Sequence, residues 1–215
     1  MTATDNVTLF HAPQSRSAGT LALLEELGAP FELHALNLKA GDQRAPAYLA
    51  VNPMGKVPAI RHGDAVITEQ VAIVLYLADT FPEAGLAPAI GDPLRGPYLR
   101  WMAFYAACYE PALVDKMMKH EPAMQSTCPY GDFETMLGTL KDQLAKGPYI
   151  LGERFSAADV HWGGALRWGR MFDLVPADPI IDDYVQRITS RPAFDRAAAR
   201  DAELVAEQQK ALEGA

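Results

Sequence analysis

Hydrophobic and polar positions follow two different periods in the N-terminal part of the chain. The run VTLF at 7–10 is rich in β-forming residues and predicts a short strand. The next stretch, SAGTLALLEELG, has apolar residues at helical spacing, and Gly28 is a typical helix stop. FELHALNL then places Phe31, Leu33 and Ala35 on one face, as a second strand would. The pattern therefore predicts a strand, a helix and a strand in that order.

The following residues indicate a loop, a hairpin and another helix. GDQRAPAYLAVNP is typical of a loop with a short irregular helix, and HGD separates the β-rich runs VPAIR and AVITE as a turn would. A helix from about residue 69 to residue 80 is apolar on most faces, which predicts burial against a sheet. The first crossover would join parallel strands, and the last strand pair would be antiparallel. This order predicts a thioredoxin-like domain.

A stretch dense in proline and glycine, at 81–97, separates this half of the chain from a second half. The patterns after it are helical, and the first of them forms either one long helix or two helices broken near Pro111. The expected fold class is therefore α/β plus all-α. We expect a thioredoxin-like domain at 1–82, a linker at 83–93 and an all-helical domain at 94–215.

The composition limits the classes of function. The chain has 215 residues, a formal net charge of -8 and a pI of about 5.1, so it is a poor candidate for binding nucleic acid or an anionic membrane. No signal-peptide pattern opens the sequence, and its longest apolar run, VAIVLYLA, is too short to span a bilayer. The two cysteines, Cys108 and Cys128, form no CxxC pair. We expect a cytoplasmic protein without a bound metal.

The segment NPMGKVPAIRHGDAVITEQVAIVLYLADTFP carries most of the chemistry. Pro58 pushes Val57 into an extended conformation, so the backbone of Val57 would present its N–H and C=O groups to a bound peptide. Glu69 and Gln70 open a helix, and the free N–H groups at a helix N-terminus attract a carboxylate. The alternatives are an ordinary strand-start proline and a Glu69 that only favours the helix dipole, by a few tenths to about 1 kcal/mol.

This segment, together with HAPQSRS, LLEELG and the capping motif SAAD, closely resembles the glutathione transferase family over most of the chain. The resemblance, which is to bacterial-type members, implies a glutathione-binding first domain, an electrophile pocket in the second, a homodimer and a cis Val57–Pro58 bond. It also implies that Lys56 pairs with the glycyl carboxylate and that Glu69 and Gln70 hold the γ-glutamyl end. The family usually has serine at the position of Gln70, so an amide N–H would replace a hydroxyl as the donor.

The activator of the thiol must be sought in the loop between the first strand and the first helix. A hydrogen bond to a charged group contributes about 1.5–3 kcal/mol, which exceeds the usual effect of a helix dipole, so a positioned hydroxyl should dominate. The loop holds no tyrosine or cysteine. Ser15 is therefore the first candidate and Ser17 the second, with Arg16 as a cation between them. Both serines could instead cap the helix. His11 either contacts glutathione or lies at the edge of the core.

Two side-chain patterns stand out in the second half of the chain. Met102, Tyr105 and Tyr109 recur at i, i+3 and i+7 and form one stripe of a helix. We consider this stripe as a lining of the electrophile pocket, although such stripes more often face a core. Ser156 and Asp159 have capping-box spacing, which predicts a buried carboxylate with a structural role.

The sequence thus indicates a glutathione transferase that conjugates the thiolate of its co-substrate, glutathione, to a small, mostly apolar electrophile, as in detoxification. One alternative is a glutathione-dependent peroxidase or reductase. The absence of a cysteine near Ser15 argues against disulfide exchange through a protein thiol, but not against reduction by glutathione itself. A second alternative is a non-catalytic glutathione-binding module. The electrophile itself is not specified, since apolar pockets carry no motif.

Overall fold

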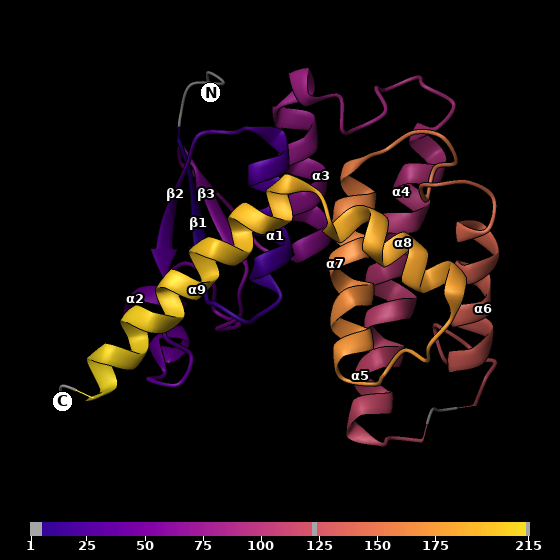
Figure 1. Ribbon diagram of the computed structural model, residues 1–215. Coiled ribbons are helices and arrows are strands. Elements are labelled where there is room, and N and C mark those ends of the chain that lie inside the picture. The colour runs from indigo at the N-terminus through magenta and orange to yellow at the C-terminus, as the bar shows by residue number, and fades with distance from the viewer. Residues whose placement is uncertain (1–5, 122–123, 214–215) are drawn as a thin grey trace. The chain divides into compact units, whose positions relative to one another are not determined.

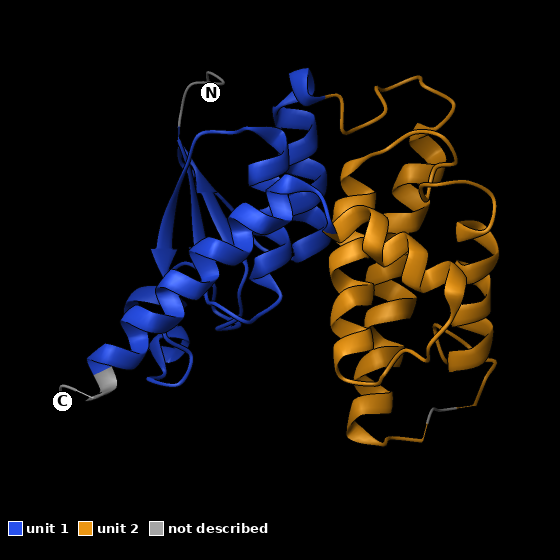
Figure 2. Ribbon diagram, viewed as in Figure 1, with its two compact units in different colours: residues 1–84, 190–215 blue, residues 85–189 orange. Residues whose placement is uncertain are grey.

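The structure is a computed structural model that describes residues 6–121 and 124–213. The chain divides into two compact units (Figure 2). Unit 1 consists of residues 1–84 and 190–215, and unit 2 of residues 85–189. Unit 1 contains the sheet, whereas the regular elements described in unit 2 are helical. The predicted combination of a thioredoxin-like domain and a helical domain is confirmed.

A four-stranded mixed sheet of order β2-β1-β3-β4 forms the centre of unit 1 (Figure 1). Strand β1 (Val7–His11) pairs in parallel with β2 (Phe31–Ala35) and antiparallel with β3 (Ala59–His62). Strand β4 (Ala65–Ile67) completes the predicted antiparallel hairpin with β3. Because side chains alternate along a strand, Phe10 and His11 at the end of β1 point to opposite faces of the sheet.

Helices cover both faces of this sheet. Helix α1 (Ser17–Leu27) packs against β1 and against α3 (Gln70–Thr80), and it ends at Gly28, whose φ of 62° is the left-handed cap that the sequence predicts. On the other face, Phe10 joins a buried apolar cluster with Leu36, which follows β2, and with residues from α2 and β3. The short elements of unit 1 are the 3-10 turn η1 (Asp42–Arg44), α2 (Pro46–Leu49) and the 3-10 turn η2 (Pro82–Ala84).

The long helix α9 (Pro192–Glu213) belongs to unit 1, where it packs along α1 (Figure 1). The predicted domain boundaries place this helix in the all-helical domain, whereas the compact units place it with the sheet. The physical reason is a set of ion pairs with Glu25 and Glu26, two carboxylates in the last turn of α1, where a negative charge is unfavourable. Arg196 and Arg200 contact Glu25 at 2.7 and 2.8 Å, and Arg191 contacts Glu26.

Unit 2 begins with one continuous helical run in three parts. The π-helical turn η3 (Tyr105–Tyr109) links α4 (Arg95–Phe104) to α5 (Glu110–Met118). Pro111 lies in the first turn of α5 and has no N–H to donate to the preceding turn, which accounts for an irregular turn at this point. The sequence predicts either one long helix or two helices broken near Pro111. The structure has a continuous helix that contains a π-helical turn just before Pro111. The other helices are α6 (Phe133–Leu144), α7 (Ala157–Met171) and α8 (Pro179–Thr189).

Aromatic side chains and one buried carboxylate hold unit 2 together. Trp162 on α7 is fully buried, and its indole N–H donates to the carbonyl of Trp101 on α4 at 3.2 Å. The predicted capping box between Ser156 and Asp159 is present at the start of α7. Burial raises the pKa of Asp159, and hydrogen bonds from Ile150, Tyr184 and Ser156 act in the opposite direction. The predicted structural role of Asp159 is confirmed.

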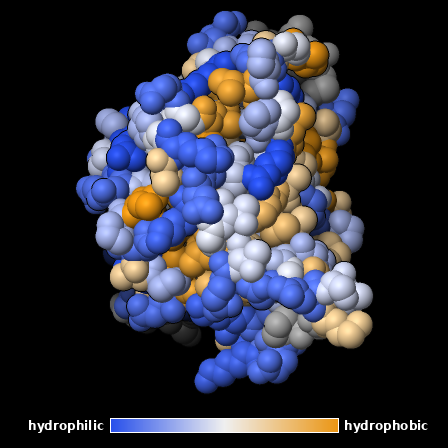
Figure 3. Space-filling view, turned by 90° about the vertical axis from the view of Figure 1, so that its right-hand side faces the viewer, coloured by the Kyte–Doolittle hydropathy of each residue, from blue (hydrophilic) through white to orange (hydrophobic). Residues whose placement is uncertain are grey.

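In the described part of the chain, no helix is both long enough and apolar enough to cross a bilayer. Several large hydrophobic side chains are nevertheless exposed, among them Met54, Ile90 and Met124. On the face in Figure 3, hydrophobic side chains form separate groups between hydrophilic ones, so this face presents a mixed surface.

Candidate functional site

Three segments of unit 1 converge at one end of the sheet. The loop 12–16 follows β1 at this end, and the Val57–Pro58 bond, which is cis, leads into β3 beside it. The register places Phe10 opposite Ala59, so the end of β1 lies next to Pro58. The cis bond implied by the family resemblance is thus confirmed. The start of α3 is the third segment, because the side chain of Gln70 reaches the loop.

Glu69 stands immediately before α3 in an unusual backbone conformation. Its φ of 64° and ψ of 112° are rare for a residue with a side chain, and such a conformation costs of the order of 1–3 kcal/mol. Backbone strain of this kind is concentrated at functional sites. The side chain of Glu69 is exposed, so its carboxylate is available to an ammonium group beside the helix N-terminus.

Gln70 connects the start of α3 with the loop before α1. Its amide Nε2 donates to the carbonyl oxygen of Arg16 at 3.0 Å. A Cβ atom at Gly19 would lie 3.3 Å from this Nε2, so the glycine leaves room for the amide on α1. One hydrogen of the amide is used in this bond, and the second hydrogen and the N-terminal end of α3 remain for an anion. The side chain of Arg16 itself is exposed.

The segment before Pro58 has a fixed backbone and an exposed lysine. The carbonyl oxygen of Lys56 accepts from the Tyr48 hydroxyl at 2.5 Å and from the Asn52 amide at 2.8 Å. Burial raises the pKa of Tyr48 to about 12, so this hydroxyl keeps its proton and remains a donor. The Lys56 side chain is exposed and Val57 is half-buried. A ligand at this edge would therefore meet a rigid backbone and a mobile cation.

The two candidate serines differ in their accessibility. Ser15 is half-buried, whereas Ser17, at the start of α1, is fully buried with 0% exposure. Their hydroxyl oxygens lie 2.7 Å apart. Ser15 Oγ also accepts from the backbone N–H of Ser17 at 3.2 Å, and Ser17 Oγ accepts from the N–H of Ala12 at 3.1 Å. Ser15 thus accepts from the first residue of α1, whereas Ser17 binds the loop and does not cap the helix, whose N-cap residue is Arg16. Of the two serines, only Ser15 has a surface for a ligand.

His11 is fully buried and uses both ring nitrogens. Its Nδ1 lies 2.8 Å from Ser17 Oγ, and its Nε2 lies 2.7 Å from Oδ1 of Asp201 on α9. This corrects the expectation that His11 contacts glutathione directly, because its side chain has neither exposed surface nor a free nitrogen. The burial of Ser17 likewise excludes direct contact between its hydroxyl and a thiol in this conformation.

Asp201 is the site residue that the sequence analysis missed. Its second carboxylate oxygen accepts from the backbone N–H of Gln14 at 3.0 Å, so one side chain fixes both His11 and the loop. Asp201 lies 190 positions from His11 in a polar helix, with no motif around it. Only the prediction that α9 packs on α1 would have pointed to it.

The three residues considered for the electrophile pocket lie in the interior. Met102 and Tyr109 are fully buried, and Tyr105 is nearly so. The hydroxyl of Tyr109 donates to the carbonyl of Ala165 at 3.3 Å, and that of Tyr105 donates to Glu110 at 2.7 Å. This environment favours the alternative reading of the stripe as core, since fully buried side chains offer no surface to a substrate.

The cysteines and the acidic residues suggest no further chemistry. Cys108 and Cys128 form no disulfide, are partly buried and belong to unit 2. Burial raises the pKa of the Cys108 thiol, which disfavours a reactive thiolate. Within residues 6–121 and 124–213, no group of three or more His, Cys, Asp or Glu side chains is arranged to hold a metal ion.

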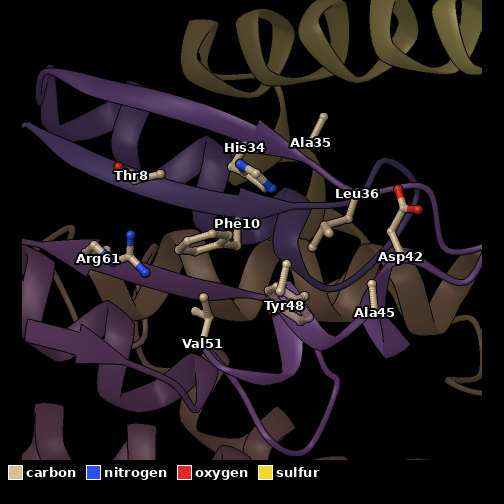
Figure 4. A pocket seen from close by; sticks show the side chains of 11 residues that line it. Thr8, Phe10, His34, Ala35, Leu36, Asp42, Ala45, Tyr48, Val51 and Arg61 are labelled. Atoms are coloured by element: carbon tan, nitrogen blue, oxygen red, sulfur yellow. The ribbon is translucent and has the colours of Figure 1, made fainter.

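A separate hollow lies on the opposite face of the sheet (Figure 4). Its volume is about 410 Å³, and Phe10 on β1 and Tyr48 on α2 form part of its wall. The guanidinium of Arg61 lies 5.5 Å from the centre of the Phe10 ring. Because Phe10 and His11 face opposite ways, this hollow is not part of the site around Ser15.

Two family models match the chain. The model described as "Glutathione S-transferase, N-terminal domain" matches residues 5–79, and the model described as "Glutathione S-transferase, C-terminal domain" matches residues 131–192. The first match includes Ser15, the cis proline and the start of α3.

Individual proteins agree with these matches. The chain is 28% identical to glutathione S-transferase GstA of Escherichia coli O157:H7, with 90% of this chain and 98% of that protein covered. It is also 28% identical to the disulfide-bond oxidoreductase YfcG of Escherichia coli K12, with 89% and 94% covered. Among solved structures, a sphingomonad glutathione S-transferase complexed with glutathione has a TM-score of 0.74 and 30% identity, with 91% of this chain and 98% of that chain covered.

Proposed function

The chain belongs to the glutathione S-transferase family, and we propose that it conjugates the thiolate of glutathione to a small, mostly apolar electrophile. In this reaction Ser15 stabilises the glutathione thiolate, whose sulfur forms a bond to an electrophilic carbon while the leaving group on that carbon departs with its bonding electrons. The observation that carries the proposal is the position of Ser15, a partly accessible hydroxyl in the loop where the cis Val57–Pro58 bond and the start of α3 converge.

The proposed binding mode uses each segment of the site for one part of the tripeptide. The N-terminus of α3 and the free amide hydrogen of Gln70 bind the γ-glutamyl carboxylate, and Glu69 binds the ammonium group. The backbone of Val57 pairs with the cysteinyl residue, as in recognition by strand addition. Lys56 pairs with the glycyl carboxylate. The sphingomonad relative, which was solved with glutathione, supports this class of ligand.

The electrophile site and the assembly are proposed on family membership. Helix α4 and the turn η3 carry the proposed Met102, Tyr105 and Tyr109 stripe, and its burial implies that a substrate meets the neighbouring side chains of that helix or requires the stripe to move. A homodimer is the proposed assembly. Sedimentation equilibrium measures its mass, and a monomer at micromolar concentration would contradict it.

Spectroscopic titration of bound glutathione tests the function. We expect wild-type protein to bind glutathione and to lower the pKa of its thiol, which the ultraviolet absorbance of the thiolate reports across pH. Ser15→Ala should raise this pKa by about 1–2 units, because a hydrogen bond to a charged group is worth about 1.5–3 kcal/mol. Conjugation of chlorodinitrobenzene should slow by about 10- to 100-fold. The exposed Ser126→Ala provides a matched control.

The outcomes separate the alternatives. Glutathione bound with an unshifted thiol pKa and no turnover would contradict the transferase and favour the non-catalytic binding module. A thiolate that reduces disulfides or peroxides but does not conjugate electrophiles would favour the reductase or peroxidase. Failure to bind glutathione at all would leave only the fold in common with the family.

A glutathione-dependent disulfide reductase is the second candidate, and the similarity to YfcG favours it. In that reaction two glutathione molecules reduce one disulfide to two thiols and leave as oxidised glutathione. Neither cysteine of the chain is in the loop 12–16, so the attacking thiolate would come from glutathione. The same Ser15 hydroxyl would stabilise that thiolate. Assays with a mixed disulfide and with chlorodinitrobenzene on one preparation distinguish the two activities.

A further inference from the structure

Four polar side chains form a continuous hydrogen-bonded chain from α9 to the loop surface. Asp201 Oδ1 lies 2.7 Å from His11 Nε2, and His11 Nδ1 lies 2.8 Å from Ser17 Oγ. Ser17 Oγ lies 2.7 Å from Ser15 Oγ. His11 and Ser17 are fully buried, Asp201 is 17% exposed, and Ser15 is half-buried. The chain therefore leads from a carboxylate through two buried side chains to the partly accessible hydroxyl of Ser15.

The donors and acceptors in this chain have a definite order. An ionised carboxylate only accepts, so the His11 Nε2–H donates to Asp201 and leaves Nδ1 without a hydrogen. Nδ1 can then accept from the Ser17 hydroxyl, for which the carbonyl of Ala12, at 3.0 Å, is the competing acceptor. The oxygen of Ser17 in turn accepts from the Ser15 hydroxyl, for which the carbonyl of Ala12, at 2.7 Å, is the competing acceptor. In this order the hydroxyl hydrogens point along the chain toward His11, and Ser15 Oγ, which also accepts from the backbone N–H of Ser17, keeps one lone pair for a ligand.

We propose that Asp201, His11 and Ser17 form a relay that accepts the proton lost by the glutathione thiol and thereby turns Ser15 into a donor to the thiolate. The proposal rests on the proposed function and extends it. Ser15 is the catalytic residue, because it touches the sulfur. Ser17, His11 and Asp201 act through it as positioning residues.

The step balances in atoms and charge. The S–H bond breaks, and its proton goes to Ser15 Oγ while the original hydrogen of Ser15 passes to Ser17 Oγ. The hydrogen of Ser17 passes to His11 Nδ1. Each serine keeps one hydrogen, the sulfur becomes an anion, and His11 becomes an imidazolium facing Asp201. Each hydroxyl now points outward, so Ser15 donates its hydrogen bond to the thiolate, where it stabilises the nucleophile.

Asp201 is suited to hold this arrangement for two reasons. Its charge stabilises an imidazolium and selects the tautomer of His11 that leaves Nδ1 as the acceptor. Its second oxygen binds the N–H of Gln14, whose φ of 57° is unusual for a residue with a side chain, so the same carboxylate fixes the loop that carries Ser15. The ion pairs of Arg196 and Arg191 hold α9 on α1 independently of Asp201.

Proton counting tests the relay on the wild-type protein. Glutathione is mixed with the protein in weak buffer, a pH indicator reports the protons released, and ultraviolet absorbance reports the thiolate formed. S-methylglutathione, which has no thiol, gives the release due to binding alone. After its subtraction, we expect fewer protons released than thiolates formed, because His11 retains part of them. One proton released for each thiolate would overturn the relay and leave the proposed function intact.

Variants test the residues in turn. In His11→Asn the Oδ1 atom can still accept from Ser17, but no group can take up the proton, so proton release should equal thiolate formation. Asp201→Asn should behave similarly, and both should lower kcat/KM by about 10- to 100-fold. Affinity for S-methylglutathione should stay within about twofold of the wild type, which checks that the site is folded. Arg196→Gln, which weakens the docking of α9 without touching the relay, is the matched control.

The proposed function and the proton relay would each be contradicted by a different experimental result. If the wild type forms no thiolate, the proposed function and the relay fall together. If the wild type forms thiolate and Asp201→Asn matches Arg196→Gln in proton release and kcat/KM, only the relay is overturned. The wild-type proton count decides the question even where a variant does not fold.

Discussion

His161 is a histidine in an environment that holds it neutral. It lies on α7 in unit 2 with 3% of its surface exposed, and its ring centre is 4.0 Å from that of Tyr105. Neither ring nitrogen has a hydrogen-bond partner among the described residues. Burial lowers the pKa of His161 from 6.5 to about 3, because a charged imidazolium in this interior would lose its hydration. By contrast, both ring nitrogens of the buried His11 have hydrogen-bond partners. The two histidines are both buried but differ in their polar neighbours.

This burial predicts a pH-dependent stability. Between pH 6.5 and about 3 the unfolded chain binds a proton at His161 that the folded chain does not. The free energy of unfolding should therefore be fully retained above pH 6.5 and should fall as the pH drops, by about 2 kcal/mol at pH 5. Urea titrations of the wild type and His161→Leu at pH 7 and pH 5 measure this, because the variant lacks the titrating group. Equal pH dependence in the two proteins would contradict the prediction.

Close packing between helices depends on glycines at particular places on α7. A Cβ atom at Gly163 would lie 2.5 Å from Cγ2 of Ile188 on α8, a distance at which one of the helices must move. Further along α7, a Cβ atom at Gly169 would lie 2.7 Å from Val175 and 2.9 Å from the hydroxyl of Tyr109. Helical propensity alone would favour alanine at both positions, so packing accounts for these glycines.

A matched pair of variants separates the effect of a helical glycine on packing from its effect on helical propensity. Gly163→Ala should destabilise the protein by about 1–3 kcal/mol, since α8 must shift to admit the methyl group. Gly138→Ala on α6, where no atom lies within 4 Å of the added Cβ, should stabilise it by up to about 1 kcal/mol. Chemical denaturation measures both changes. Similar stability in the two variants would show that α7 and α8 have room to adjust.

At the scale of the whole chain, unit 1 is built from two separate parts of the sequence. The segment up to residue 84 supplies the sheet and its helices, and α9 (Pro192–Glu213) returns to cover α1. The carboxylate side chain of Glu25 is only 8% exposed, and its two arginine partners both come from α9. Helix α9 therefore supplies the cations that pair with the carboxylate of Glu25. It also supplies Asp201 to the candidate site of unit 1.

Removal of α9 should affect unit 1 more than unit 2. A chain ending at residue 189 loses the ion pairs of Glu25 and Glu26 with their arginines and the packing of α9 on α1, both of which stabilise unit 1. We expect amide hydrogen exchange to accelerate across residues 7–80. The tryptophans, at 101, 162 and 168, all lie in unit 2, so their fluorescence should change little. A control that lacks only 211–215 should match the full chain, and unchanged exchange in the shorter chain would contradict the prediction.

Local sequence patterns were enough to predict the elements, the class of fold and the segments proposed to bind glutathione. Hydrophobic periodicity and turn residues act over a few positions, so β1, α1, the β3–β4 hairpin and the capping box of α7 could be predicted from their own residues. The motif around Val57 and Pro58 is likewise local, and the structure has the cis bond that the resemblance implies.

The residues around the candidate thiol activator could be identified only from the packing of unit 1. Ser15 and Ser17 are two positions apart and chemically alike, and burial, which depends on the whole of unit 1, makes one accessible and the other internal. His11 meets Asp201 across 190 positions because α9 packs on α1. A polar helix with no motif does not show where it will pack, since its ion pairs and hydrogen bonds exist only once distant segments are brought together.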